Sequence, residues 1–386
     1  MRKRTLLVAL VAAFAAVALG TGFTVHKNAA EYHIAMIAPL TGPYVFVGGP
    51  EVQAAKAAVA EINKAGGVNG HKLVLTVFDD ATNPGQSLGY TRQVISDSKY
   101  IAMIGTGFSS AALPDEQLTS QAGLVDVAMS ASDAQVYPTK TGVYVVPPIS
   151  RLFAYKMGRY LRDAKITKLA LLHDNTGYPT AGVANVRQFA GAYGLDILAD
   201  QTFDLSATDF TPELTSLKSS GAQAIWLWNL PNAVAITKQY RSLGIPQKLV
   251  LTGGQATPQY IGAACPYDNG ALIDSPLAQV AQYLPKTNKS RPLALHVDKI
   301  MKQQGNQFGY DGYTGVLIIQ KAIEMGGGTR AGILNALESG KFVLHGPEGL
   351  YKYSKRRHTG LGLASLVVSQ IKNCKIVPLK GQMPTK

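Results

Sequence analysis

The chain has 386 residues, more than one hydrophobic core usually serves, so its length predicts two lobes. Hydrophobic residues make up 46% and charged residues 16% of it, which fits a folded globular protein and excludes a disordered one. Beyond a basic N-terminus, the positive charge (formal net +13) is scattered and is not interleaved with aromatic residues, which argues against nucleic-acid binding. The basic trio Lys355-Arg356-Arg357 is interpreted as a solvated surface turn.

The N-terminus has the pattern of a secretory signal peptide. Basic residues at positions 2–4 precede an apolar run from Leu6 to Leu19, shorter than the roughly 20 residues of a membrane span. Cleavage after Gly20 and cleavage after Ala30 both fit, and an uncleaved anchor is the minor alternative. We therefore expect residues 1–30 to be a signal peptide that takes no part in the fold.

Export would place the only two cysteines, Cys265 and Cys374, in an oxidising compartment. One disulfide and two buried thiols are both compatible with the sequence, because nothing in it shows how close their Cα atoms come.

Strand-like and helix-like segments then alternate twice along the chain. The first set comprises strand 33–37, helix 51–64, strand 71–78, helix 84–97, strand 100–104, helix 114–121 and strand 124–128. The second set comprises helix 152–163, strand 168–173, helix 181–193, strand 196–203, helix 212–219, strand 224–228, helix 233–243 and strand 248–252. This alternation, with short Gly/Pro loops, predicts an α/β fold of two doubly wound parallel-sheet lobes.

The halves are separated by an extended segment that ends in Pro147-Pro148, where we expect a crossover. Further on, the spacing predicts an amphipathic region at 292–304, helices at 313–325 and 330–337, a turn at 345–349 and a strand at 363–371.

The segment MIGTGFSSAALP, residues 103–114, joins a strand to a helix through two glycines. It imitates a dinucleotide fingerprint, but Ser110 replaces the third glycine, so that match is weak. No nucleophile elbow surrounds Ser109 or Ser110, and the histidines and cysteines lack metal-ligand spacing, so we expect no catalysis, no metal and no cofactor. Free N–H groups at a helix start, with serine hydroxyls beside them, predict an anion site, although helix capping alone would also explain the serines.

Other polar residues follow predicted strands and would meet this loop at one edge of a sheet. They are Ser130 and Ser132, Asn175 to Tyr178, and Asn229.

Four motifs resemble one known family. They are IAMIAPLTGP, AAVAEINKAGGVNGHKLVLTVFDD, AMIGTGFSSAALP and YDGYTGVLIIQKAIEMGG. Over residues 31–375 the chain resembles the substrate-binding proteins of branched-chain amino acid ABC transporters, which are leucine-binding-protein-like type I periplasmic binding proteins. The resemblance implies a periplasmic, monomeric receptor that is not an enzyme. Such a receptor closes over a small carboxylate-bearing ligand and delivers it to an inner-membrane ABC permease. A ligand sensor is an alternative.

The resemblance also implies two lobes joined by three crossovers. We expect the N-terminal lobe to comprise residues 31–146 and about 276–345. The C-terminal lobe would comprise residues 147–275 and about 346–386.

For the binding site, the resemblance makes Ser109 the carboxylate donor, with Ser110 beside it. It places Ser130 and Ser132 at the ligand's polar head. It makes Tyr178 the second-lobe residue that covers the ligand, and Asn229 a further contact.

Two loops depart from the family pattern. LTGGQATP carries Gln255 where leucine-type members have an acid that pairs with the ligand ammonium, and Phe46 stands where an aromatic hydroxyl is common. A buried ammonium without a counter-charge is costly. The ligand is therefore either an aromatic or short organic carboxylate, or an amino acid whose ammonium meets carbonyls, Ser132 and another acid such as Asp126 or Asp204.

Overall fold

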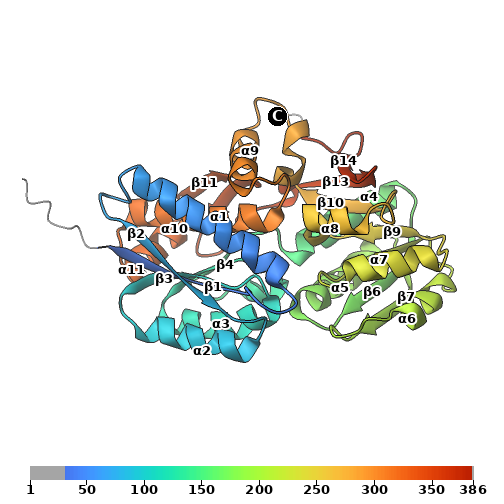
Figure 1. Ribbon diagram of the computed structural model, residues 1–386, viewed down its shortest axis with the longest axis horizontal. Coiled ribbons are helices and arrows are strands. Elements are labelled where there is room, and N and C mark those ends of the chain that lie inside the picture. Colours follow the sequence, from blue (N-terminus) through green and yellow to red (C-terminus); the bar gives the residue numbers. More distant parts are fainter. Residues whose placement is uncertain (1–30, 385–386) are drawn as a thin grey trace, which may run out of the picture.

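The computed structural model describes residues 31–384 and shows two α/β lobes side by side (Figure 1). The predicted signal peptide, residues 1–30, lies outside the described residues. Among the residues that are described, no helix is long and apolar enough to cross a lipid bilayer.

The first lobe is built on five parallel strands in the order β2-β1-β3-β4-β5. They are β1 Tyr32–Ala38, β2 Leu73–Asp79, β3 Tyr100–Ile104, β4 Val125–Ala128 and β5 Val143–Val145. Its early helices are α1 Val45–Lys64, α2 Pro84–Ser96 and α3 Ser109–Ala122. The chain returns to this lobe with α9 Ser290–Met301, α10 Gln307–Gly326, α11 Arg330–Glu338 and the hairpin of β11 Phe342–Gly346 and β12 Gly349–Tyr353.

The second lobe has seven strands in the order β14-β13-β10-β9-β8-β6-β7. They are β6 Lys168–Asp174, β7 Asp196–Phe203, β8 Ala224–Trp228, β9 Lys248–Leu251, β10 Leu272–Pro276, β13 Leu366–Lys372 and β14 Lys375–Pro378. Its helices are α4 Ser150–Asp163, α5 Gly177–Ala190, α6 Thr211–Lys218, α7 Ala233–Ser242 and α8 Pro258–Ala264. The parallel strands repeat the order of the first sheet, while β13 and β14 are antiparallel. The prediction of two doubly wound lobes is confirmed.

Three segments cross between the lobes. They are residues 146–149, the junction of β10 with Leu277, and the stretch between β12 and β13. The third segment continues the first sheet for a short distance, because Thr359 forms a parallel bridge to Val145. Tyr351 and Tyr353 of β12 belong to the first lobe's core. We therefore propose a lobe boundary after this hairpin rather than at about residue 346.

Several helices begin earlier than predicted, among them α3 at Ser109 instead of residue 114 and α5 at Gly177 instead of residue 181. Helix α1 starts at Val45 instead of residue 51, although its first turns contain two glycines and Pro50. Tertiary packing overrides the weak local propensity there, because a Cβ on Gly48 would lie 2.7 Å from the carbonyl carbon of Pro39. Helix α10 starts at Gln307 instead of residue 313, since several glycines hide its apolar periodicity.

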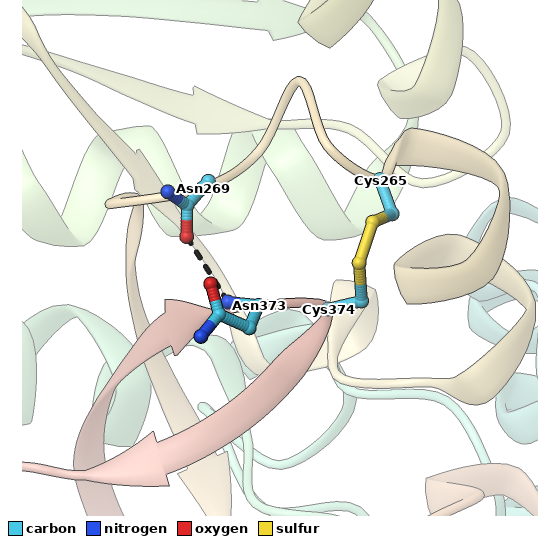
Figure 2. Close-up of a disulfide and its surroundings, with 4 residues drawn as sticks. All are labelled: Cys265, Asn269, Asn373 and Cys374. Atoms are coloured by element: carbon cyan, nitrogen blue, oxygen red, sulfur yellow. Dashed lines mark hydrogen bonds between the residues drawn. A yellow bond between two sulfur atoms is a disulfide. The ribbon is translucent and has the colours of Figure 1, made fainter.

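The two cysteines form a disulfide (Figure 2). Cys265 follows α8 and Cys374 lies in the turn between β13 and β14, with their Cα atoms 5.5 Å apart. Beside the bridge, the backbone N–H of Asn373 donates to Oδ1 of Asn269 at 3.1 Å. The disulfide thus fastens the antiparallel edge to the rest of the second lobe.

Candidate functional site

The candidate site lies between the lobes, where loops at the carboxyl ends of strands face one another. In the first lobe the loop after β3 leads into α3, and in the second lobe the loop after β6 leads into α5. In each sheet the strand order reverses beside these strands, and ligands of open α/β sheets bind at such switch points.

A narrow cavity lies between these loops, in which about 30 Å³ is open to the centre of a water-sized sphere. Both lobes contribute to its apolar wall, which includes Tyr44, Phe108, Met129, Phe153, Leu230 and Phe308. Its polar side chains are Ser109, Ser130, Thr176, Tyr178, Gln307 and Asp311. A mostly apolar wall with a few polar groups is typical of small-molecule sites.

Several donors at this cavity lack a protein acceptor. Within residues 31–384, the hydroxyls of Ser130 and Tyr178 are buried without a hydrogen-bond partner. Helix α3 begins at Ser109 with no side-chain cap on its first turn, so its N–H groups and positive dipole end face the cavity loop. Burial raises the pKa of Tyr178, which keeps its hydroxyl protonated and able to donate. These donors suit an anionic ligand group.

Of the residues that the sequence predicted, Ser109, Ser130 and Tyr178 meet at the cavity. Ser110 does not line it; its Oγ accepts a hydrogen bond from the Gly177 N–H of the other lobe at 3.0 Å. Ser132 is fully buried next to the cavity loop, outside the lining, and its hydroxyl has no partner among the described residues.

Three further predicted residues lie behind or beside the cavity. Asn229 donates to Asp174 Oδ2 at 2.7 Å and holds the end of β8 against the end of β6. Gln255 accepts from the Thr252 backbone N–H at 2.9 Å and donates to the backbone carbonyl of Asn229, so it orders its own loop. Phe46 lines a neighbouring hollow together with Gln255. Their roles at the ligand stay predictions.

The two acids considered as ammonium partners do not line the cavity. Asp126 is buried behind the loop after β3, 3.4 Å from the Thr119 hydroxyl, and Asp204 is exposed, where it accepts from Asn175 at 3.1 Å. The carboxyl that does line the cavity is Asp311 of α10, which sequence reasoning missed.

A signal for Asp311 was present. Polar residues recur at positions 307, 311 and 314 in the first half of α10, which is otherwise built of glycine, aromatic and aliphatic residues, and this spacing puts them on one face. Buried polar residues on an apolar helix face indicate a site rather than a surface.

Within residues 31–384, no group of three or more His, Cys, Asp or Glu side chains is arranged to hold a metal ion. The fold and the cavity define a two-lobed protein that binds a small ligand between its lobes, a class in which the lobes move as hinged bodies.

Comparison with known proteins identifies the family. A family model described as periplasmic binding protein matches residues 31–375. The curated relative Leu/Ile/Val-binding protein homolog 3 of Brucella melitensis is 29% identical over 332 residues, which are 81% of this chain and 84% of the relative. The chain belongs to the periplasmic binding protein family, a family of periplasmic or extracellular solute-binding proteins, and is not an enzyme.

Two solved structures share the fold. The branched-chain amino acid transporter substrate-binding protein of Streptococcus pneumoniae, in complex with isoleucine, matches with a TM-score of 0.78 and 20% identity, covering 90% of this chain and 98% of that one. An ABC transporter solute-binding protein of R. palustris, in complex with benzoate, matches with a TM-score of 0.79 and 17% identity, covering 91% of this chain and 96% of that one.

Proposed function

We propose that the protein is the solute-binding receptor of an ABC importer and captures a small carboxylate-bearing solute by closure of its two lobes. The observation that carries this proposal is the convergence of partnerless donors, the hydroxyls of Ser130 and Tyr178, with the uncapped start of α3 on a cavity between the lobes. An arriving carboxylate would accept the hydrogen bonds that these groups lack, which makes its capture favourable.

The ligand's carboxylate binds at Ser109 and the N-terminus of α3, while its apolar body contacts the aromatic wall formed by Phe108, Phe153 and Phe308. An amino acid of the branched-chain type or a related one is the leading candidate, in line with the isoleucine-bound S. pneumoniae structure. An aromatic or short organic acid is the second candidate, because the wall is rich in aromatic rings and the R. palustris relative is bound to benzoate.

The receptor role implies a periplasmic location, export through residues 1–30, a monomeric state and delivery to an inner-membrane permease. A sensor would use the same closure without a permease. Uptake of labelled solute into membrane vesicles that contain the permease of the proposed importer, with and without the protein, distinguishes the two roles. If the protein is a transport receptor, uptake requires it.

Isothermal titration of the mature protein with leucine, phenylalanine and benzoate tests the carboxylate site. We expect Ser109→Ala to weaken binding of the tightest of these probes by about 1–3 kcal/mol, the cost of leaving a charged partner without its hydrogen bond. Ser216→Ala, an exposed serine of α6, is the matched control and should leave affinity unchanged. Unchanged affinity in Ser109→Ala would remove Ser109 from the site.

A further inference from the structure

Asp311 is an unusual member of the cavity wall. It lies in the second turn of α10, its side chain is 1% exposed, and it is the one carboxyl among the described residues that line this cavity. Neither of its oxygens makes a hydrogen bond of ordinary geometry within residues 31–384. A buried carboxyl at a ligand cavity whose neighbouring donor is a second carboxyl, that of Glu348, favours the approach of a further donor.

The groups that face Asp311 are themselves acidic. The Glu348 carboxyl, from the turn between β11 and β12, approaches it, and Glu51 of α1 adds a second carboxyl nearby. Glu348 Oε2 already accepts from the Tyr351 hydroxyl at 3.0 Å, and the Tyr353 ring lies in the same buried region. Burial, followed by the charge of nearby Asp80, raises the pKa of Glu51. None of these carboxyls forms an ion pair within the described part of the chain.

The same acids lie close to the loop that takes the ligand carboxylate. A Cβ added at Gly107 would sit 2.9 Å from Glu51 Oε2, so this carboxyl is packed directly behind the loop. The cavity therefore has hydrogen-bond donors at one end, at Ser109, and a carboxyl group at the other, at Asp311. The first end suits an anionic group of a ligand and the second end suits a cationic group.

Burial and the neighbouring carboxyls favour the protonated forms of these acids. Burial, followed by the Glu348 and Glu51 carboxyls, raises the pKa of Asp311 well above its usual range. Burial likewise raises the pKa of Glu348. A cation placed against Asp311 would reverse this balance, because an opposite charge favours the ionised carboxyl.

We propose that Asp311 is the subsite for a cationic group of the ligand, an ammonium, so that the ligand is an amino acid, and that its binding expels one proton from Asp311 to the solvent. The proposal rests on the proposed function, which supplies the carboxylate half of the site. The Asp311 carboxylic acid becomes a carboxylate, its proton passes to the buffer, and the ligand ammonium keeps its own protons. A simple organic acid has no cationic group that could pair with these carboxyls.

The proton release is measurable by isothermal titration at pH 7 in phosphate, HEPES and Tris, whose ionisation enthalpies differ. The dependence of the observed enthalpy on the buffer's ionisation enthalpy gives the number of protons exchanged. The probes are phenylalanine and leucine, each paired with its des-amino acid, 3-phenylpropanoate or 4-methylpentanoate. We expect tighter binding of the amino acids, with release approaching one proton, and no release with the des-amino acids.

Asp311→Asn tests the residue itself, with Asp163→Asn, an exposed carboxyl of the second lobe, as the matched control. We expect Asp311→Asn to abolish proton release and to reduce the preference for phenylalanine over 3-phenylpropanoate by tenfold or more. Asp163→Asn should keep both. Circular dichroism and thermal unfolding check that each variant is folded. If Asp311→Asn does not fold, Glu348→Gln serves in its place, because it leaves Asp311 present. We expect Glu348→Gln to reduce the proton release.

The outcomes separate this inference from the proposed function. Amino acid binding without proton release, or a preference that Asp311→Asn leaves unchanged, overturns the inference, while a weakened affinity in Ser109→Ala would still support the carboxylate site. Tight binding of the des-amino acids alone also overturns it. If none of the four probes binds the wild-type protein, the proposed ligand class and this inference both fail.

Discussion

Gly312 of α10 lies directly against the backbone of Glu51 in α1, so that a Cβ at position 312 would be 2.7 Å from the Glu51 carbonyl carbon. The two helices therefore touch backbone to backbone. This close approach brings Glu51 near Asp311, which lines the cavity between the lobes, although the two residues are far apart in the sequence.

We predict that Gly312→Ala destabilises the first lobe by about 1–3 kcal/mol, because the added methyl group forces the two helices apart and exceeds the gain in helix propensity. The matched control is Gly89→Ala in α2, where an added Cβ meets nothing within 4 Å. That change should stabilise the protein by about 0.5–1 kcal/mol. Urea unfolding followed by circular dichroism measures both, and equal stability of the two variants would contradict the prediction.

The hydrogen bond from the Gly177 N–H to Ser110 Oγ joins the lobes and exists only when they are together. We predict that Ser110→Ala weakens the affinity for the best-binding titration probe by about 1 kcal/mol, the usual net value of one hydrogen bond. The urea midpoint should stay close to the wild-type value, since neither lobe loses an internal contact. Small-angle scattering should show a larger radius of gyration for the variant without ligand; an identical radius and affinity would refute the role in closure.

The disulfide should matter for stability and not for binding. Cys265 and Cys374 are 109 residues apart, and neither lines the cavity. Replacing both by serine should lower the free energy of unfolding by about 2–5 kcal/mol, because the unfolded chain regains the freedom that the crosslink removes. Thermal unfolding of the double variant, and of the wild type in reductant, measures the loss, and titration with the same probe checks that affinity is kept.

The raised pKa of a buried carboxyl predicts that the folded protein is more stable in mild acid than at alkaline pH. Burial raises the pKa of Asp115 from 3.8 to about 7, although the Ser87 hydroxyl donates to its carboxyl. Between about pH 4 and pH 7 the folded state then holds a proton that the unfolded chain has lost, so the free energy of unfolding falls as the pH rises through this window.

Asp115→Asn removes this contribution because an amide does not titrate. From pH 4 to pH 8, the stability of the variant relative to the wild type should improve by roughly 2–4 kcal/mol. Urea midpoints at pH 4, 6 and 8 measure the difference. A variant whose pH profile parallels that of the wild type would show that Asp115 does not carry the effect.

Local patterns in the sequence were sufficient for most of the architecture. Alternating apolar segments with Gly and Pro between them determine strands, helices and their parallel order, because burial of a sheet between two helix layers follows from residue periodicity. The early starts of α1 and α10 were missed, since those turns depend on contacts between helices and not on local propensity.

The sequence by itself determined the two-lobed α/β fold and the serine loop at Ser109, since both follow from residues that are neighbours along the chain. Only the tertiary structure decided that Cys265 pairs with Cys374, that Ser110 faces Gly177 across the lobes, and that Asp311 reaches the cavity. Each of these depends on the distance between segments far apart in sequence, which is set by how helices and sheets pack and leaves no mark in the local pattern.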